Sequence, residues 1–460
     1  MTDTAASPTT ATRGTPVLVA AVLASFVAFL DGTVVNVALP AIGRELGGGV
    51  LTQQWVVDGY LLSLGALILL AGAISDSFGR LRVLVFGLIG FGVASLACAL
   101  APTALLLILA RVVQGFAGAL LVPSSLALIT STFSGTAQAQ AIGRWTAWTS
   151  GALIAGPLLG GLLVDTIGWR WVFGINVLPI AATLLVLRGM REPTRVGKRP
   201  RIDGIGALLG AVGLAGPVFA LIEQERLGIS SPLVLGPLVV GVASLVAFVG
   251  WERRATSPML PLRMFRVRNF GWGNLATLFI YAALAIGPLA LSLYLQQVGG
   301  FSATLAGAVG LPASVLMLAL GGLVGRLSGR FGPRLFMTVG PALSAAGFLW
   351  FLFVREPLDF WLQVLPGLLV FGIGLTLTVS PLTSAVLGSI APARSGIASA
   401  VNNAVARIAG LAAVACLGLI LAGALDTDGF HRVAVVAALL MALGSLASWI
   451  GIRRPVEPSA

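Results

Sequence analysis

Long apolar segments joined by short polar loops constrain this chain more than any other feature. A helix needs about 20 mainly apolar residues to cross a bilayer, and windows of that length pick out fourteen such segments in the 460 residues. Only 10% of the residues are charged, which is too few to cover the surface of a soluble protein of this length. The sequence therefore predicts an all-α membrane protein with fourteen spans.

The placement of basic residues predicts how the chain is oriented. The formal net charge of +12 would suit a nucleic acid or another acidic partner. However, most of the Lys and Arg residues lie in alternate loops, and hence on one side of the predicted membrane. The positive-inside rule makes that side cytoplasmic, and the even number of spans places both termini there. We therefore expect no nucleic-acid partner. Arg is almost the only basic residue, as in GC-rich bacterial genomes, which points to a bacterial cell (inner) membrane.

A short internal repeat predicts two similar halves. Gly72, Ser75, Phe78 and Gly79 recur in register as Gly325, Ser328, Phe331 and Gly332. Both copies lie in a predicted cytoplasmic loop just before a new span, as expected for two six-helix bundles repeated in parallel. The alternative is a turn chemistry shared by two short loops. The predicted layout is a disordered tail (1–15), a six-helix bundle (16–190), basic loops with an extra helix pair (191–268), a second six-helix bundle (269–454) and a tail (455–460).

The first predicted span contains a single charge, Asp31, between Pro16 and Pro40. An ionisable side chain inside a bilayer is a functional hypothesis by default. A carboxyl group kept from water can take up and release a proton near neutral pH, which a proton-coupled carrier requires. The alternative is a polar residue that bonds to a neighbouring helix for packing only.

The loop after the second span has the composition of a charged latch. It combines Gly72 and Gly79, which permit tight turns, with Asp76 and Arg80 at i, i+4 spacing. Such a latch would form a bistable cytoplasmic gate. The alternative is an ordinary basic inner loop.

The fourth span places Arg111 in its middle, with Gln114 on the same helical face. A guanidinium group without a partner is too costly in lipid, so we expect it to bond to carbonyl groups or to a carboxylate, with Asp31 and Asp58 as candidates. A purely structural pairing is the alternative.

The fifth span carries small residues and a proline in its interior. Gly156, Gly160 and Gly161 allow close helix approach, and Pro157 is expected to kink the helix. Helix packing alone would explain most of this pattern.

Taken together, these motifs resemble the major facilitator superfamily. The segment from Trp169 to Phe173, followed by Asn176 and Pro179, and the fourteen spans resemble its fourteen-helix drug:proton antiporter branch. The resemblance implies two six-helix bundles with alternating access, and export driven by the proton gradient. It makes Asp31 the proton-linked acid, Arg111 the residue that tunes it, and the Asp76 loop the cytoplasmic gate.

The resemblance does not assign a single role to Asp58 or a single class of substrate to the cavity. Asp58 could be a second protonation or cation site, or an acid in contact with water at the outer vestibule. The late spans lack the acids that some multidrug relatives carry, so divalent cations are disfavoured, whereas neutral, monovalent and anionic substrates stay open. The residues predicted to line the cavity are Asn36, Gln114, Tyr281, Tyr294, Asn402 and Arg407.

The predicted function is proton-coupled export of hydrophobic small molecules. The alternatives are an exporter of one metabolite or antibiotic, and a membrane sensor that transports nothing. We expect no enzyme activity, cofactor or metal, because His431 is the only histidine and both cysteines, Cys98 and Cys416, lie in apolar segments. The expected partners are a hydrophobic substrate, protons and the lipid bilayer, and the chain is expected to be monomeric.

Overall fold

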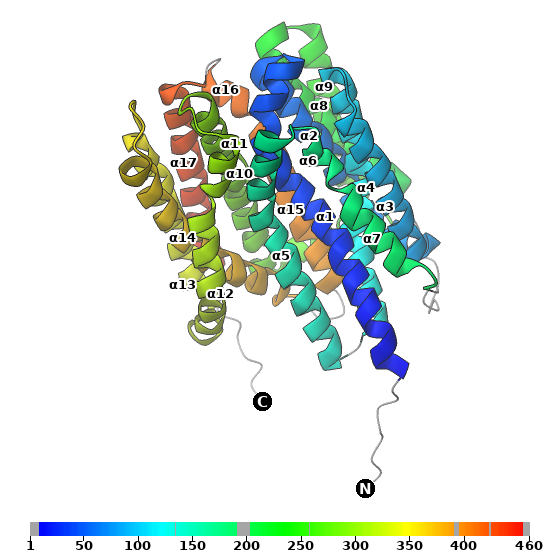
Figure 1. Cartoon of the computed structure of the whole chain (residues 1–460). Coiled ribbons are helices and arrows are strands. Elements are labelled where there is room, and N and C mark those ends of the chain that lie inside the picture. The colour runs from blue at the N-terminus through cyan, green and yellow to red at the C-terminus, as the bar shows by residue number, and fades with distance from the viewer. Residues whose placement is uncertain are drawn as a thin grey trace.

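The computed structural model describes residues 9–133, 135–190, 203–256, 258–390, 395–422 and 425–453. Its regular structure is entirely helical throughout these ranges (Figure 1). Eleven of the described helices are long and apolar enough to cross a membrane. The all-α, multi-pass membrane class is therefore confirmed. The count of fourteen spans and the side of the membrane on which the termini lie stay predictions.

The N-terminal half is a bundle whose first helix begins earlier than predicted. Helix α1 starts at Thr9, inside the segment 1–15 that was expected to be a disordered tail, of which residues 1–8 lie outside the described ranges. The helices of this half are α1 (Thr9–Leu46), α2 (Gly49–Phe78), α3 (Arg80–Ala99), α4 (Ala104–Thr132), α5 (Gly135–Thr166), α6 (Trp171–Gly174) and α7 (Val177–Leu187).

The chain continues through an extra helix pair into the C-terminal half. The pair is α8 (Gly204–Leu227) and α9 (Pro232–Glu252). The helices that follow are η1 (Leu262–Arg266), α10 (Arg268–Gln297), α11 (Ala303–Ala308), α12 (Leu311–Phe331), α13 (Pro333–Trp350), η2 (Phe351–Phe353), η3 (Phe360–Val364), α14 (Leu365–Leu387), α15 (Ser395–Ala415), α16 (Leu417–Leu421) and α17 (Thr427–Gly451).

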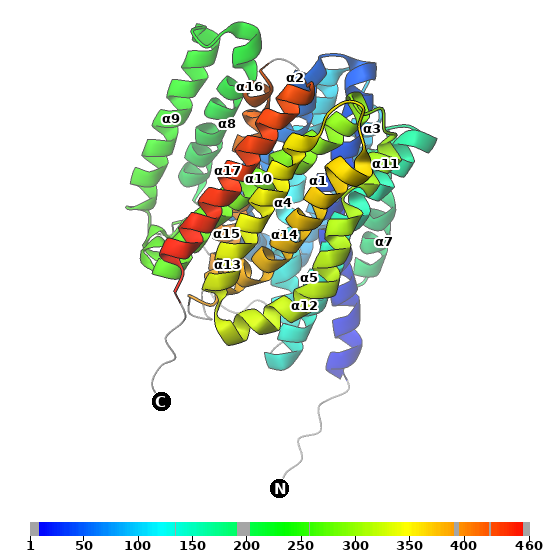
Figure 2. The same ribbon diagram turned by 90° about the vertical axis from the view of Figure 1, so that its left-hand side faces the viewer.

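Helices α8 and α9 stand at the side of the molecule. Figure 2 shows α9 at its outer edge, with α8 between α9 and the rest of the bundle. Helix α8 packs against α2 of the first half and α15 of the second. The indole Nε1 of Trp55 on α2 donates to Oε1 of Glu223 on α8 at 2.9 Å. The extra pair is thus attached along the seam between the two halves.

The two copies of the sequence repeat have the same backbone geometry. Gly79 joins α2 to α3 with φ of 108°, and Gly332 joins α12 to α13 with φ of 86°. In each junction the glycine N–H donates to the carbonyl four residues earlier, that of Ser75 at 3.1 Å or that of Ser328 at 2.9 Å. An L side chain rarely adopts this backbone conformation, which is why glycine recurs at both positions.

The halves meet closely where α5 packs on α11. Near the end of α5, the carboxylate of Asp165 accepts from the backbone N–H groups of Ala303 and Thr304 at 3.1 and 2.7 Å. Gln54, near the start of α2, donates to the carbonyl of Val414 at the end of α15 at 2.9 Å. Figure 1 shows the start of α1 at the bottom of the view and α11 and α16 toward the top. These contacts therefore join the halves at the end away from the start of α1.

Candidate functional site

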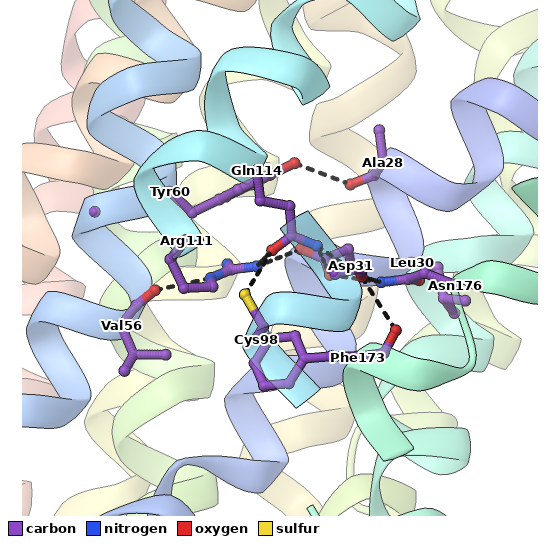
Figure 3. A network of polar contacts seen from close by, with 12 residues as sticks. Ala28, Leu30, Asp31, Val56, Tyr60, Cys98, Arg111, Gln114, Phe173 and Asn176 are labelled. Atoms are coloured by element: carbon purple, nitrogen blue, oxygen red, sulfur yellow. Dashed lines mark hydrogen bonds and ion pairs between the residues drawn. The ribbon is translucent and has the colours of Figure 1, made fainter. Parts of the chain in front are cut away.

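The buried carboxylate of Asp31 on α1 is the centre of a polar cluster inside the N-terminal half (Figure 3). Its Oδ2 lies 2.6 Å from Nη1 of Arg111 on α4. Its Oδ1 accepts from Nε2 of Gln114 at 2.9 Å and from Nδ2 of Asn176, the residue before α7, at 2.8 Å. Three donors that surround the carboxylate stabilise its charged form. Of the two carboxylates predicted as partners of Arg111, the structure therefore selects Asp31 over Asp58.

Arg111 has partners besides the carboxylate. Its Nε donates to the carbonyl of Val56 at 3.0 Å, and its Nη1 also donates to Oε1 of Gln114 at 2.7 Å. The guanidinium carbon lies 4.2 Å from the centroid of the Tyr60 ring, a cation–π distance. The guanidinium would therefore keep two acceptors and a ring if Asp31 became neutral.

Ser95 on α3 holds the two amide side chains in place. Its hydroxyl accepts from Nε2 of Gln114 at 3.1 Å and from Nδ2 of Asn176 at 2.9 Å, and it donates to the carbonyl of Phe173 at 3.1 Å. Ser95 was not among the residues predicted to have a role, and Asn176 was only part of the family resemblance. An Asn in an apolar segment was a usable signal, whereas a Ser in a packed helix is common and gave none.

Asp58 on α2 has a different environment. Its side chain is also fully buried, yet neither carboxyl oxygen has a hydrogen-bond partner among the described residues. The alternative of an acid in contact with water therefore does not hold in this conformation. A buried carboxyl group without a donor is expected to stay uncharged, because burying an unpaired charge is costly.

The predicted latch between Asp76 and Arg80 lies across a helix junction. Gly79 ends α2 and Arg80 begins α3, so the two residues are on different helices and the i, i+4 relation does not apply to them. The side chain of Asp76 lies outside what the structure describes. Nη1 of Arg80 donates to the carbonyl of Ala127 on α4 at 3.1 Å. The gating role of Gly72, Asp76, Gly79 and Arg80 remains a prediction.

The glycines of α5 lie where other helices come closest. A Cβ atom at Gly156 would collide with the side chain of Thr33 on α1, and one at Gly160 would lie 2.6 Å from the carbonyl oxygen of Val34. A Cβ atom at Gly161 would meet the backbone of Ala303 on α11. Helix α5 continues through Pro157 as one helix. The glycines therefore let α5 pack on α1 of its own half and on α11 of the other.

Three of the residues predicted to line the cavity form polar contacts inside the protein. Gln114 is fully buried in the Asp31 cluster. Tyr294 is fully buried, with its hydroxyl 3.0 Å from that of Thr427. Nδ2 of Asn402 donates to Oγ1 of Thr277 on α10 at 2.8 Å, which ties α15 to α10.

Asn402 and the other three predicted cavity residues keep accessible surface. Asn36 on α1, Tyr281 on α10 and Arg407 on α15 are each partly exposed. The guanidinium carbon of Arg407 lies 5.7 Å from the ring centroid of Phe29 on α1, so this side chain reaches from one half to the other. Among the described residues, no three His, Cys, Asp or Glu side chains group as metal ligands would.

Comparisons with known proteins agree with this architecture. The chain is 37% identical to a puromycin resistance protein of Streptomyces alboniger, over 88% of this chain and 82% of the relative. It is 34% identical to a methylenomycin A resistance protein of Streptomyces coelicolor, over 100% of this chain and 97% of the relative. An auto-inhibited peptide transporter of the POT family has the same fold, with a TM-score of 0.67 at 16% identity over 97% and 99% of the two chains. The family profile of the Major Facilitator Superfamily matches residues 21–414. The chain thus belongs to the Major Facilitator Superfamily, as a relative of its drug resistance exporters.

Proposed function

We propose that this chain is a proton-coupled secondary transporter that exports hydrophobic small molecules by alternating access. The names of the relatives, which are resistance proteins for puromycin and methylenomycin A, support export of such compounds. The proposal keeps the predicted layout of fourteen spans, with bundles at 16–190 and 269–454 and both termini in the cytoplasm.

The observation that carries the proposal is the buried pair of Asp31 and Arg111. An ion pair this deep in a membrane protein marks a proton or ion pathway more often than a structural contact. When Asp31 takes up a proton, the pair is lost, but Arg111 keeps the carbonyl of Val56 and the amide of Gln114. The cluster therefore has two well-bonded arrangements, which a proton-driven switch needs.

The accessible face of α1 lies beside Asp31, and the carboxylate itself does not line it. The side chains of Phe29 and Asn36 keep accessible surface, whereas Asp31 is fully buried toward α4 and α7. Substrate and proton would therefore not share one pocket. Coupling would pass through movement of α1 against α4, with substrate on one face of α1 and the proton on the other.

Contacts between the two halves support a state that is closed at the outer end. With the termini in the cytoplasm, the contacts of Asp165 with α11 close the outer end. The glycines of α5 would stabilise this closed state, and the loop from Gly72 to Arg80 would close the inner end in the opposite state. We further propose Asp58 as a second protonation site, because its carboxyl group is buried without a partner among the described residues.

Proton flux in proteoliposomes tests the proposal. Purified protein is given an imposed pH gradient and a panel of neutral, cationic and anionic hydrophobic compounds, and internal pH is followed. We expect substrate-dependent flux in the wild type and none in Asp31→Asn. Asp426→Asn is the matched control, because Asn can replace this N-cap acid of α17. Normal pumping by Asp31→Asn would refute the proton-coupling role of Asp31.

A narrow exporter is the second candidate function. The names of the two resistance proteins each specify a single compound. In the same assay, flux with one compound of the panel would favour the narrow exporter. Binding without any proton movement would favour a sensor.

A further inference from the structure

Arg407 is a charged side chain in the interior of the protein whose role is not explained by the Asp31 cluster. It lies within α15, eight residues before the end of that helix at Ala415. Its guanidinium faces the ring of Phe29 at 5.7 Å and lies within electrostatic range of the hydroxyl groups of Tyr60 and Tyr281. These rings come from α1, α2 and α10, so the positive charge lies between the two halves.

No carboxylate compensates this charge in the part of the chain that the structure describes. Arg407 forms no salt bridge there, and Asp31 is already paired with Arg111. The sequences of α10, α14 and α15 contain no Asp or Glu. Asp58 is not a partner, because both of its oxygens lack a donor. A guanidinium group at this depth is costly unless something else supplies negative charge.

The surroundings of Arg407 indicate what could supply that charge. On α10, partly or fully exposed side chains recur at Leu278, Tyr281, Ala285 and Pro288, which lie on one face of the helix. This face is apolar and aromatic, as is Phe29 opposite. An apolar surface with one fixed cation is suited to a ligand with a hydrophobic body and one anionic group.

We infer that Arg407 binds the anionic group of the substrate, so that the exported compounds are hydrophobic monoanions such as aromatic carboxylates or sulfonates. This inference rests on the proposed export function and adds the substrate class. It also has an electrical consequence. If one anion leaves for each proton that enters, two positive charges move inward per cycle, compared with one charge for a neutral substrate.

Binding of a matched probe series tests the inference independently of proton coupling. The probes are naphthalene-2-sulfonate, the neutral naphthalene-2-sulfonamide and the cation 2-naphthyltrimethylammonium, titrated calorimetrically into protein in lipid nanodiscs. We expect the sulfonate to bind at least about ten-fold more tightly than the sulfonamide, which is one decade of affinity. Arg407→Gln should remove that preference and leave sulfonamide binding within about two-fold. Arg407→Lys, which keeps the charge, should retain most of it.

The control is Arg355→Gln, which removes the same charge at an exposed loop position. It should bind all three probes as the wild type does. The inference is overturned if the sulfonate binds no more tightly than the sulfonamide, if the cation binds best, or if Arg407→Gln keeps the anion preference. An Arg407→Gln protein that loses binding of every probe equally would indicate a structural role and would also overturn it.

Flux measurements separate this inference from the proposed function. If the sulfonate binds through Arg407 but no compound drives proton movement, the coupling proposal fails and the anion site stands. If neutral compounds drive Asp31-dependent flux as well as the sulfonate does, coupling stands and the anion site fails. With both correct, a membrane potential that is negative inside should accelerate sulfonate export more than sulfonamide export.

Discussion

Asp31 and Asp58 are the same residue type and are equally buried, yet they differ in their hydrogen-bond partners. Asp31 accepts three hydrogen bonds, one of them from a guanidinium, whereas Asp58 has no partner among the described residues. Hydrogen-bond donors and a cation stabilise a carboxylate, and burial alone disfavours it. The two carboxyl groups therefore differ in their partners and not in their burial. The role of a carboxyl group in a span is therefore defined by its hydrogen-bond partners and not by its position alone.

The largest effect should follow from leaving the Asp31 carboxylate without its cation. Arg111→Gln should destabilise the protein by about 3–5 kcal/mol, the cost of breaking one side of a buried ion pair. Thermal unfolding in detergent measures this, with Arg355→Gln as the surface control. The double variant Asp31→Asn with Arg111→Gln should regain part of the loss, because no unpaired charge remains. A single variant as stable as the control would show that the pair contributes little.

A substitution on α5 should disturb α1, which carries Asp31, and leave the surroundings of Asp58 on α2 unchanged. Gly160→Ala places a Cβ atom 2.6 Å from the carbonyl oxygen of Val34, which is backbone and cannot turn away. We expect α1 to shift, a loss of about 1–3 kcal/mol from overpacking, and reduced export. Gly151→Ala is the matched control on the same helix, because a Cβ atom there meets nothing within 4 Å. Equal export by the two variants would contradict a role for close α5–α1 packing.

Asp165 is an exposed acid, and its carboxylate joins the two halves at the outer end. Asp165→Ala removes two hydrogen bonds to α11, a loss of about 1 kcal/mol, and should favour states open at that end. With the native cysteines replaced, labelling of Asn36→Cys by an impermeant maleimide from outside should become faster. Asp165→Asn keeps an acceptor and should show a smaller change. Unchanged labelling in Asp165→Ala would show that this contact does not hold the outer end closed.

Asp58 should show the smallest effect on stability. Because its carboxyl group has no described partner, Asp58→Asn should change the free energy of unfolding by less than about 1 kcal/mol. If Asp58 is a second protonation site, the number of protons moved per substrate should fall in proteoliposomes while export continues. A large destabilisation would show that Asp58 is charged and paired, and would remove the contrast with Asp31.

The sequence was most informative where a residue type is costly anywhere except at a special site. Arg111 is costly in lipid, so a partner such as a carboxylate could be anticipated, with Asp31 and Asp58 as the candidates. Gly79 and Gly332 recur because both helix junctions need a positive φ. Long apolar segments likewise predicted the helices, since a chain in a bilayer must satisfy its backbone within the helix.

Other features depended on how the helices are arranged in space. Asp76 and Arg80 are four residues apart in the sequence, but Gly79 lies between them, where α2 ends and α3 begins. Tyr294 and Asn402 were predicted to line the cavity, and only the structure shows that Tyr294 hydrogen-bonds to Thr427 and Asn402 to Thr277. Ser95 gave no signal at all, yet it positions both amides of the cluster.

By itself, the sequence determined that this chain is a bundle of membrane-spanning helices with a charged pair in its first half, because apolar length and costly charges depend only on the order of residues. Only the tertiary structure decided which charges compensate one another. Asp31 is bound by residues of α4 and by the residue before α7, and Arg407 faces the ring of Phe29 on α1. The physical reason is that pairing depends on distances between helices, which sequence spacing does not specify.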